Sequence, residues 1–445
     1  MRTYFFIIRN PARVNFILRT DLFRMLKERE DRLVIVSPFS SDPAFVKEFG
    51  GASVVFETMV APNRLAHTAA YWREQAFASV HPAIQFAREV HAGITKGFGQ
   101  AQGTVWKIKS LIRAAALGVL PRSIRRSHAL WNRIERFCTK ASVARTLFDR
   151  YAPDAVFVAT AGEEKSFLVE CSARGIVSCN VDSNIDAPQL RYFSEPRPVT
   201  SWALFGEPVK KQMVAFHHVP ESSLAVTGAL RYDYLFREFQ PSERAAFFEK
   251  LALDPRKKLV VYAAKISKMY PSNELVIKSI LDAIASGELL NTQLFVRFDP
   301  GHDVSRYGTL LNEIVWEMAD LASSRDHVAN LLYHADAVTS IASTFNMEAM
   351  IFDTPSTWIA FDGNRSDGPT SKHYQLAVFD DLIKRTAILR SDSSSQLINQ
   401  LKEAIDKPEK HSGARKQALL DYYHATDGNA GKRIIELIDG LFQKH

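Results

Sequence analysis

The sequence has few cysteines and no long apolar run, and each shortage excludes a class of protein. Three cysteines among 445 residues are too few for a disulfide framework, and no two of them have the Cys-x-x-Cys spacing of a metal site. We therefore expect a cytoplasmic, reducing environment. The opening apolar run, Tyr4–Ile8, has five residues, and no run in the sequence approaches the ~20 residues of a membrane span. Any membrane contact is expected to be peripheral.

The excess of positive over negative charge is also small, and the sequence has no low-complexity tract and no internal repeat. The formal net charge is +7, which is too small an excess to indicate a general nucleic-acid-binding protein. Hydrophobic residues make up 46% and charged residues 24%, a composition that excludes wholesale disorder and supplies apolar surface for a large core. The length suits two large α/β domains.

Strand and helix patterns alternate through the first half of the chain. Tyr4–Ile8 is predicted to be a buried strand and Val14–Arg29 a helix, followed by strands at Leu33–Ser37 and Ala52–Phe56. This order predicts βαβ units and a parallel sheet. Residues 64–150 then indicate a helical excursion. Strand patterns return at Ala155–Ala159, Ile176–Cys179, Ser201–Phe205 and Leu224–Thr227.

A second series of strands follows a charged connecting segment. We expect an N-terminal domain at residues 1–236, a linker at 237–258 containing Pro241 and Pro255, a second domain at 259–405 and C-terminal helices at 406–445. The second-domain strands are predicted near Leu259–Ala264, Leu294–Phe298, Ala337–Ser340, Ser356–Ala360 and Thr386–Leu389. The predicted fold class is α/β, with two Rossmann-like doubly wound domains facing a cleft and a basic helical insertion in the first.

The segment from Ala335 to Pro355 carries the clearest indication of a binding site. A strand is expected to end at Ser340, so the hydroxyls of Ser343 and Thr344 would lie where a helix begins at the carboxyl edge of a parallel sheet. Backbone N–H groups at a helix start bind anions such as phosphate. Glu348, one turn further on, could accept hydrogen bonds from sugar hydroxyls. Simple helix capping by Ser343 explains the same residues without a ligand.

This segment resembles the donor-nucleotide segment of glycosyltransferases of the two-domain GT-B fold. Its pattern is Ala-Asp-x-x-x-Ser-x-x-Ser-Thr-x-x-x-Glu-Ala, with Pro355 seven residues beyond Glu348. Val226–Leu235 resembles the Thr-Gly-x-x-Arg-x-Asp junction of bacterial surface-polysaccharide transferases, including CDP-glycerol glycerophosphotransferase-like proteins. The resemblance implies donor binding by Gly228 and Arg231. A glycine turn before a helix would explain this second motif without a ligand.

Two further cations are candidates for holding a donor diphosphate. Leu294-Phe-Val-Arg-Phe-Asp-Pro-Gly-His is similar to the Arg-x-His-Pro of the same group and implies a role for Arg297, although Asp299 stands where those proteins usually have His. Lys265 directly follows a predicted strand that ends at the same edge. The alternative to a role in diphosphate binding is that Lys265 is simply a solvated surface lysine. We expect no metal, because the sequence offers no Asp-x-Asp donor site and the fold neutralises the leaving group with N–H groups and cations.

The resemblance favours an inverting mechanism, because position 340, eight residues before Glu348, is serine and not the second glutamate of common retaining enzymes. Inversion requires a general base to deprotonate the acceptor hydroxyl. The catalytic candidates are Glu163 and Asp182, with Glu164 and Asp21 as alternatives. A solvated carboxylate is the alternative for each of them, and helix capping would also explain Glu163 or Glu164 without chemistry.

Residues Lys107–Lys140 form an unusually basic stretch. It holds nine Lys and Arg residues against one acid, Glu135, which gives +8, with Trp131 and aliphatic residues between the cations. This mixture of cations and apolar residues favours binding to an anionic membrane surface. The alternative is a solvated helical face. No sequence motif supports binding to nucleic acid.

Together these features predict a metal-independent glycosyltransferase of cell-envelope polysaccharide biosynthesis, cytoplasmic or peripheral on the inner membrane face. Its partners would be a nucleotide-sugar donor and a glycan or lipid-linked acceptor, with no cofactor. It would move a sugar or a polyol phosphate. Two alternatives stay open: a non-hydrolysing nucleotide-sugar 2-epimerase, and a sugar-nucleotide-binding protein that has lost its activity.

Overall fold

The computed structural model describes residues 1–59, 64–95, 115–139, 141–159, 165–181, 184–190, 199–267, 269–319 and 325–443, and it contains two compact units. Unit 1 comprises Met1–Arg88, Gln102–Glu238 and Asp421–His445, and unit 2 comprises Glu89–Ala101 and Phe239–Leu420. The boundary at Glu238 lies two residues from the expected end of the first domain. The last 25 residues, however, return to unit 1, which the sequence pattern does not reveal.

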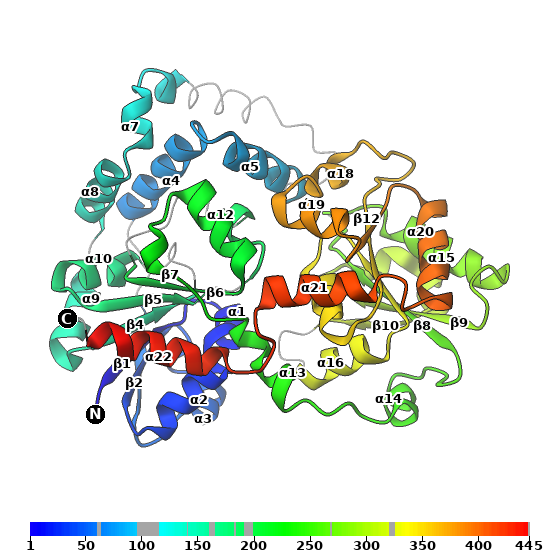
Figure 1. Ribbon diagram of the computed structural model, residues 1–445, viewed down its shortest axis with the longest axis horizontal. Helices are drawn as coiled ribbons and strands as arrows, with labels where there is room; N and C mark the ends of the chain where they lie inside the picture. The colour runs from blue at the N-terminus through cyan, green and yellow to red at the C-terminus, as the bar shows by residue number, and fades with distance from the viewer. Residues whose placement is uncertain are drawn as a thin grey trace. The chain divides into compact units, whose positions relative to one another are not determined.

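Unit 1 is built on a seven-stranded, fully parallel sheet in the order β3-β2-β1-β4-β5-β6-β7 (Figure 1). The strands are β1 (Thr3–Ile7), β2 (Arg32–Ser37), β3 (Val54–Thr58), β4 (Ala155–Val158), β5 (Val177–Val181), β6 (Ser201–Leu204) and β7 (Leu224–Val226). The central strands β1, β4 and β5 are buried along their whole length because helices cover both faces of a parallel sheet. The expected α/β class is confirmed.

The helices of unit 1 differ in detail from the expected ones. The helix predicted over Val14–Arg29 is broken by Thr20, whose hydroxyl donates to the Ile17 carbonyl at 2.5 Å. A π-helical turn at Val14–Leu18 precedes it and α2 (Asp21–Glu28) follows. Among the described residues, the other helices of more than four residues are α3 (Pro43–Phe49), α4 (Arg64–Ala78), α5 (Pro82–Thr95, of which residues 89–95 are assigned to unit 2), α7 (Arg122–Arg126), α8 (His128–Cys138), α9 (Ser142–Tyr151), α10 (Lys165–Arg174), α12 (Glu207–His217), α13 (Asp233–Arg237) and α22 (Ala430–Phe442).

Unit 2 contains a second parallel sheet, of six strands, in the order β10-β9-β8-β11-β12-β13. These are β8 (Lys258–Ala264), β9 (Thr292–Phe298), β10 (Val315–Met318), β11 (Ala337–Ser340), β12 (Ser356–Ile359) and β13 (Leu389–Ser391). The helices are α14 (Arg244–Lys250), α15 (Asn273–Ala285), α16 (Arg325–His334), α17 (Thr344–Ala349), α18 (Pro369–His373), α19 (Ala377–Lys384) and α20 (Ser394–Asp406), with α21 (Ser412–Tyr423) running on into the C-terminal segment.

The predicted linker is only partly a connecting segment. Its α14 buries Phe247 and Phe248 in a core cluster with Leu259, Val261 and Leu331 of unit 2. Residues 244–250 therefore belong to the second unit. In both units the chain order reverses beside the first strand of the unit, between β1 and β4 and between β8 and β11. Open parallel sheets bind ligands at the carboxyl edge beside such a reversal.

Candidate functional site

The carboxyl edge of the second sheet brings together residues that follow neighbouring strands. β8 and β11 are paired in parallel, with Ala263 opposite Ser340, so their carboxyl ends lie at the same edge. Lys265 directly follows β8, and the turn Ile341–Ser343 directly follows β11. The structure thus places Lys265 and Ser343 beside the reversal of chain order, as the sequence pattern predicts.

The turn after β11 is fixed by hydrogen bonds. The Ser343 hydroxyl accepts from the Phe345 N–H at 3.2 Å and so caps α17, and Thr344 is the first residue of that helix. Ala342 has a φ of 41°, and its N–H donates to the Tyr374 hydroxyl at 2.8 Å. That hydroxyl donates in turn to the Ile359 carbonyl at 2.7 Å. The capping interpretation of Ser343 is correct, and it leaves a preorganised turn at the strand end.

The start of α17 is also tied to the sheet beneath it. The buried Asn346 side chain accepts a hydrogen bond from Ser340 and donates to the Thr357 carbonyl at 3.0 Å. Glu348 lies one turn further along α17 and is half-buried. The predicted donor residues Ser343, Thr344 and Glu348 are thus held on one short, anchored element.

Lys265 lies beside a carboxylate at this edge. Its ammonium is 3.6 Å from Asp299, which follows β9, and both side chains are about a third exposed. Asp299 is the residue that replaces the usual His of the resembled motif. At this position the chain therefore has a carboxylate that pairs with Lys265, the cation proposed to hold the donor diphosphate.

Sequence reasoning missed a histidine that folds back to the same edge. Gly301, with a φ of 77°, reverses the chain, so that the buried His302 lies 2.9 Å from the Ser267 hydroxyl and 2.8 Å from the Tyr307 hydroxyl. Burial lowers the pKa of His302, which favours the neutral imidazole at pH 7. The signal was the Pro-Gly pair before His302, which is typical of a reverse turn.

Arg297 is engaged within the sheet. Its guanidinium forms an ion pair with Glu317 on the adjacent β10, and Glu317 also contacts His327 of α16 at 2.7 Å. Burial, followed by the charge of Arg297, lowers the pKa of His327. This pairing gives Arg297 a structural role in balancing a buried charge, and a role in donor binding stays a prediction.

Gly228 and Arg231 lie in unit 1, in the segment that receives the C-terminal chain. Gly228 has a φ of 98°, and a Cβ there would lie 3.4 Å from the Tyr423 carbonyl oxygen and from the Ala430 side chain. The Arg231 guanidinium lies over the rings of Tyr232 and Phe16, 4.6 and 5.0 Å from their centroids. These contacts are enough to explain the motif structurally.

The candidate bases have different outcomes. Glu163, Glu164 and Asp182 lie outside the residues that the structure describes. Asp21, at the start of α2, pairs with Arg24 at 2.9 Å and with Arg237 at 2.6 Å. Its carboxylate is thus held by two guanidiniums. Among the described residues no group of His, Cys, Asp and Glu has the arrangement of a metal site.

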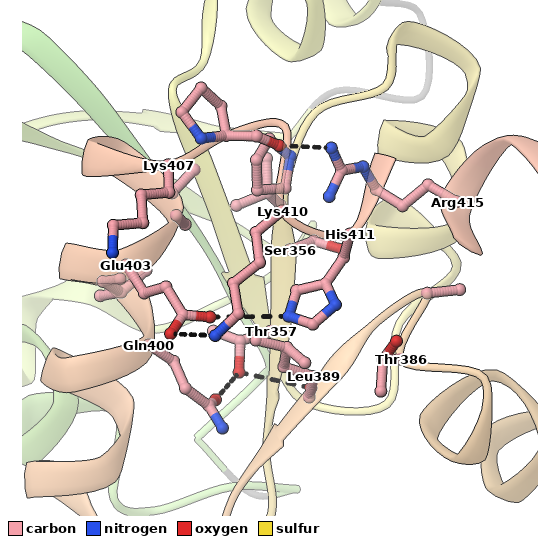
Figure 2. A pocket seen from close by; sticks show the side chains of 17 residues that line it. Ser356, Thr357, Thr386, Leu389, Gln400, Glu403, Lys407, Lys410, His411 and Arg415 are labelled. Carbon is pink, nitrogen blue, oxygen red and sulfur yellow. Dashed lines mark hydrogen bonds and ion pairs between the residues drawn. The ribbon is translucent and has the colours of Figure 1, made fainter. Parts of the chain in front are cut away.

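A pocket in unit 2 lies at the opposite edge of the sheet (Figure 2). It is lined by the first residues of three strands, Ala337, Ser356 and Leu389, and by side chains of α20 and the loop after it. Glu403 holds Lys410 at 2.6 Å and lies 3.5 Å from His411 (Figure 2). The pocket is therefore separate from the edge that carries Lys265 and Ser343.

Searches against family models and against curated proteins find no match. Among solved structures, a putative UDP-N-acetylglucosamine 2-epimerase from Listeria monocytogenes has a TM-score of 0.54 at 12% identity, covering 100% of this chain and 97% of that one. The S. aureus MnaA–UDP co-structure has a TM-score of 0.56 at 11% identity, with the same coverage. A glycosyltransferase from Rickettsia africae has a TM-score of 0.52 at 10% identity, covering 100% and 99%.

These likenesses span the whole chain at low identity, so they establish the fold. The expected GT-B architecture of two Rossmann-like domains is confirmed. The finer resemblance to glycerophosphotransferase-like proteins has no support among these structures. Within the described part of the chain, no helix combines the length and apolarity needed to cross a bilayer.

Proposed function

We propose that this protein is a GT-B glycosyltransferase that moves a sugar, or a polyol phosphate, from a nucleotide-activated donor to a cell-surface glycan acceptor. The observation that carries the proposal is the position of Lys265 and the capped turn at Ser343 on neighbouring strand ends, beside the reversal between β8 and β11. Support also comes from the similar S. aureus structure, which is a co-structure with UDP.

Each residue at this edge has a role that its chemistry suits. Lys265 would offset the negative charge of the donor diphosphate, and this contact would replace its contact with Asp299. The hydroxyls of Ser343 and Thr344 would contact phosphate oxygens, and Glu348 would accept hydrogen bonds from sugar hydroxyls. In an inverting transfer, the acceptor oxygen forms a bond to the anomeric carbon while the bond to the nucleotide diphosphate breaks. A base, for which Glu163 is the first candidate, takes the acceptor's proton.

A nucleotide-sugar 2-epimerase is the second candidate, and the name of the Listeria structure favours it. The two reactions differ in what they need: a transferase requires an acceptor, whereas an epimerase inverts C2 of the sugar without one. A protein that has lost its activity would bind the nucleotide sugar and change nothing.

A ligand screen followed by a turnover assay tests the proposal. Thermal unfolding is first compared with CDP-, CMP-, UDP-, GDP- and dTDP-linked donors, because a ligand at about a hundred times its Kd adds about 2.7 kcal/mol of stability. UDP-N-acetylglucosamine, or the donor with the largest shift, is then incubated alone and with a panel of glycan acceptors. Nucleotide release that depends on the acceptor supports a transferase. Formation of the C2 epimer without acceptor would establish the alternative, and binding without turnover would indicate an inactive binding protein.

A further inference from the structure

The inner side of α8 is held against α4 and α10 by buried ion pairs. Glu135 of α8 is 3% exposed and accepts from Arg73 of α4 at 2.5 Å, and Lys165 of α10 lies 3.5 Å away. Figure 1 shows α7 and α8 running along α4. Because Glu135 faces inward, the opposite side of α8 is its solvent side. Glu135 is also the only acid among residues 115–139, so this pairing removes the one negative charge of the described basic segment.

The solvent side of α8 carries apolar residues that no core explains. Leu130, Arg133 and Phe137 follow one another at helical spacings of three and four, so they share a face. Phe137 is 93% exposed and Leu130 is 38% exposed. Val119, in the turn that precedes α7, is 81% exposed. A single exposed apolar side chain is ordinary, but a fully exposed phenylalanine on a face shared with leucine and arginine is characteristic of an interaction surface.

The cations of this surface lack acidic partners. Arg122, Arg126 and Arg133 are exposed, and none of their side chains forms a hydrogen bond or ion pair in the described parts of the chain. Their field reaches inward as well: burial lowers the pKa of His81, and the charges of His218, Arg126 and Arg122 lower it further. Positive charge therefore accumulates at α7, and no carboxylate among the described residues pairs with Arg122 or Arg126.

We propose that the outer face of α7 and α8 docks on an anionic phospholipid surface. Phe137 and Leu130 would enter the boundary between headgroups and acyl chains, while Arg122, Arg126 and Arg133 would meet lipid phosphates. Charge complementarity selects an anionic partner, and the exposed apolar side chains that share a face of α8 with Arg133 select a lipid surface over a nucleic acid. An amphipathic helix lying in the interface, with basic residues beside an apolar stripe, binds membranes in this way.

Co-sedimentation with lipid vesicles tests this proposal on the full chain. Wild-type protein is expected to sediment with phosphatidylcholine vesicles that contain about 30% phosphatidylglycerol and to stay in solution with pure phosphatidylcholine. Raising the salt from about 0.05 M to about 0.5 M should weaken the binding. The triple variant Arg122→Glu, Arg126→Glu, Arg133→Glu should bind at least about a hundredfold more weakly, because each cation near the surface contributes about fivefold to the affinity.

Two comparisons separate docking from net charge. Reversing three exposed lysines elsewhere, Lys211→Glu, Lys250→Glu and Lys407→Glu, changes the net charge equally and should lower the affinity less than about threefold. Phe137→Ser should lower vesicle affinity about tenfold without changing thermal unfolding, because this side chain is outside the core.

Three outcomes would overturn the proposal. Wild-type protein that stays in solution with anionic vesicles at low salt has no such surface. An equal loss in the lysine control shows that only net charge matters. Binding to a DNA duplex as tight as to vesicles, unaffected by Phe137→Ser, shows a general polyanion site. None of these measurements depends on turnover, so the proposed glycosyl transfer is tested separately.

Discussion

Glu348 is the residue at which the proposed donor site can be tested most directly. It is half-buried on α17, and the helix beneath it is anchored through Asn346. Glu348→Ala should weaken binding of UDP-N-acetylglucosamine, or of the donor found by the thermal screen, by about 1–3 kcal/mol, because sugar hydroxyls would lose their acceptor. Isothermal calorimetry measures this change. Glu409→Ala, at an exposed loop position of the same unit, is the matched control and should leave the affinity unchanged. An unchanged affinity in Glu348→Ala would remove Glu348 from the donor site.

Glu163 is the residue at which the proposed chemistry can be tested. It follows the strand Ala155–Val158, whose carboxyl end lies at the edge where parallel sheets bind ligands. Glu163→Gln keeps the size of the side chain and removes its basicity. Turnover should fall by ~10²–10⁴, while donor affinity should stay within about a factor of three. The turnover rates of wild type and Glu163→Gln, measured in an acceptor-dependent assay, test this prediction. More than about a tenth of wild-type turnover would redirect attention to Glu164, Asp182 or Asp21.

Local spacing predicted which residues lie at the second sheet's carboxyl edge, and it could not predict their partners. The places of Lys265 and Ser343 could be predicted because Lys265 directly follows one strand pattern and Ser343 lies in the turn directly after another. The partner of Arg297 is Glu317, twenty residues away on a strand that the sequence did not reveal. His302 reaches its position through a turn and not through a strand end. Pairing across strands depends on sheet order, and a single sequence does not encode that order locally.

At the scale of elements, Asp233 joins two segments that are far apart in the sequence. This buried carboxylate, at the start of α13, accepts from the N–H groups of Ala430 at 3.0 Å and Gly431 at 2.8 Å, and so caps α22. Arg433 of α22 donates to the Thr227 carbonyl at 2.6 Å. The aspartate of the Thr-Gly-x-x-Arg-x-Asp motif thus anchors a helix.

Burial makes the Asp233 anchor pH-sensitive. Desolvation raises its pKa to about 6, although the hydrogen bonds from Gly431 and Ala430 oppose the rise. A carboxyl whose pKa is raised by folding stabilises the fold fully below its unfolded value near 3.8, and this contribution is lost as the pH rises through about 6. The shift of about two pKa units is worth about 3 kcal/mol in all, and roughly 2 kcal/mol of it should be lost between pH 4 and pH 7, because the unfolded carboxyl is already about half ionised at pH 4.

Denaturant unfolding from pH 4 to pH 7 measures this contribution. Asp233→Asn retains a hydrogen-bond acceptor but does not titrate, so the stability difference between wild type and variant should move in the variant's favour as the pH rises. Asp149→Asn, at an exposed ion pair with Arg174, is the control and should show no such trend. A difference that is constant across this pH range would contradict the raised pKa.

Strand prediction succeeded in the interior of the sheets and was poor at both edges of the second sheet, where the strand predicted near Thr386–Leu389 shares only Leu389 with β13. The observed bounds of β11, Ala337–Ser340, are the predicted ones, because all four residues are buried. β10 was missed, because it is an edge strand whose residues alternate between half-buried and exposed, with Trp316 37% exposed. Edge strands lack the continuous apolar signature by which buried parallel strands are recognised.

At the scale of the whole molecule, unit 1 is completed by the last part of the chain. Ala430, Ile434, Ile435 and Ile438 of α22 belong to the same core cluster as Phe6, Leu22 and Leu33. Truncation after Leu420 should therefore lower the unfolding temperature of unit 1, because those side chains leave an apolar gap on α2. The unfolding transition of unit 2 should remain. Differential scanning calorimetry of both chains tests this, and full loss of both transitions would show that the units depend on each other for folding.

The return of residues 421–445 to unit 1 also sets the order in which the chain can mature during synthesis. Unit 2 is contained in residues that leave the ribosome before the last 25, so its core can close while unit 1 still lacks α22. Until then the apolar groove around Leu22 and Phe23 stays open to water, and such a surface invites aggregation or chaperone capture. The core of unit 1 is thus completed only by residues that are synthesised after all of unit 2, contrary to the usual N-to-C order.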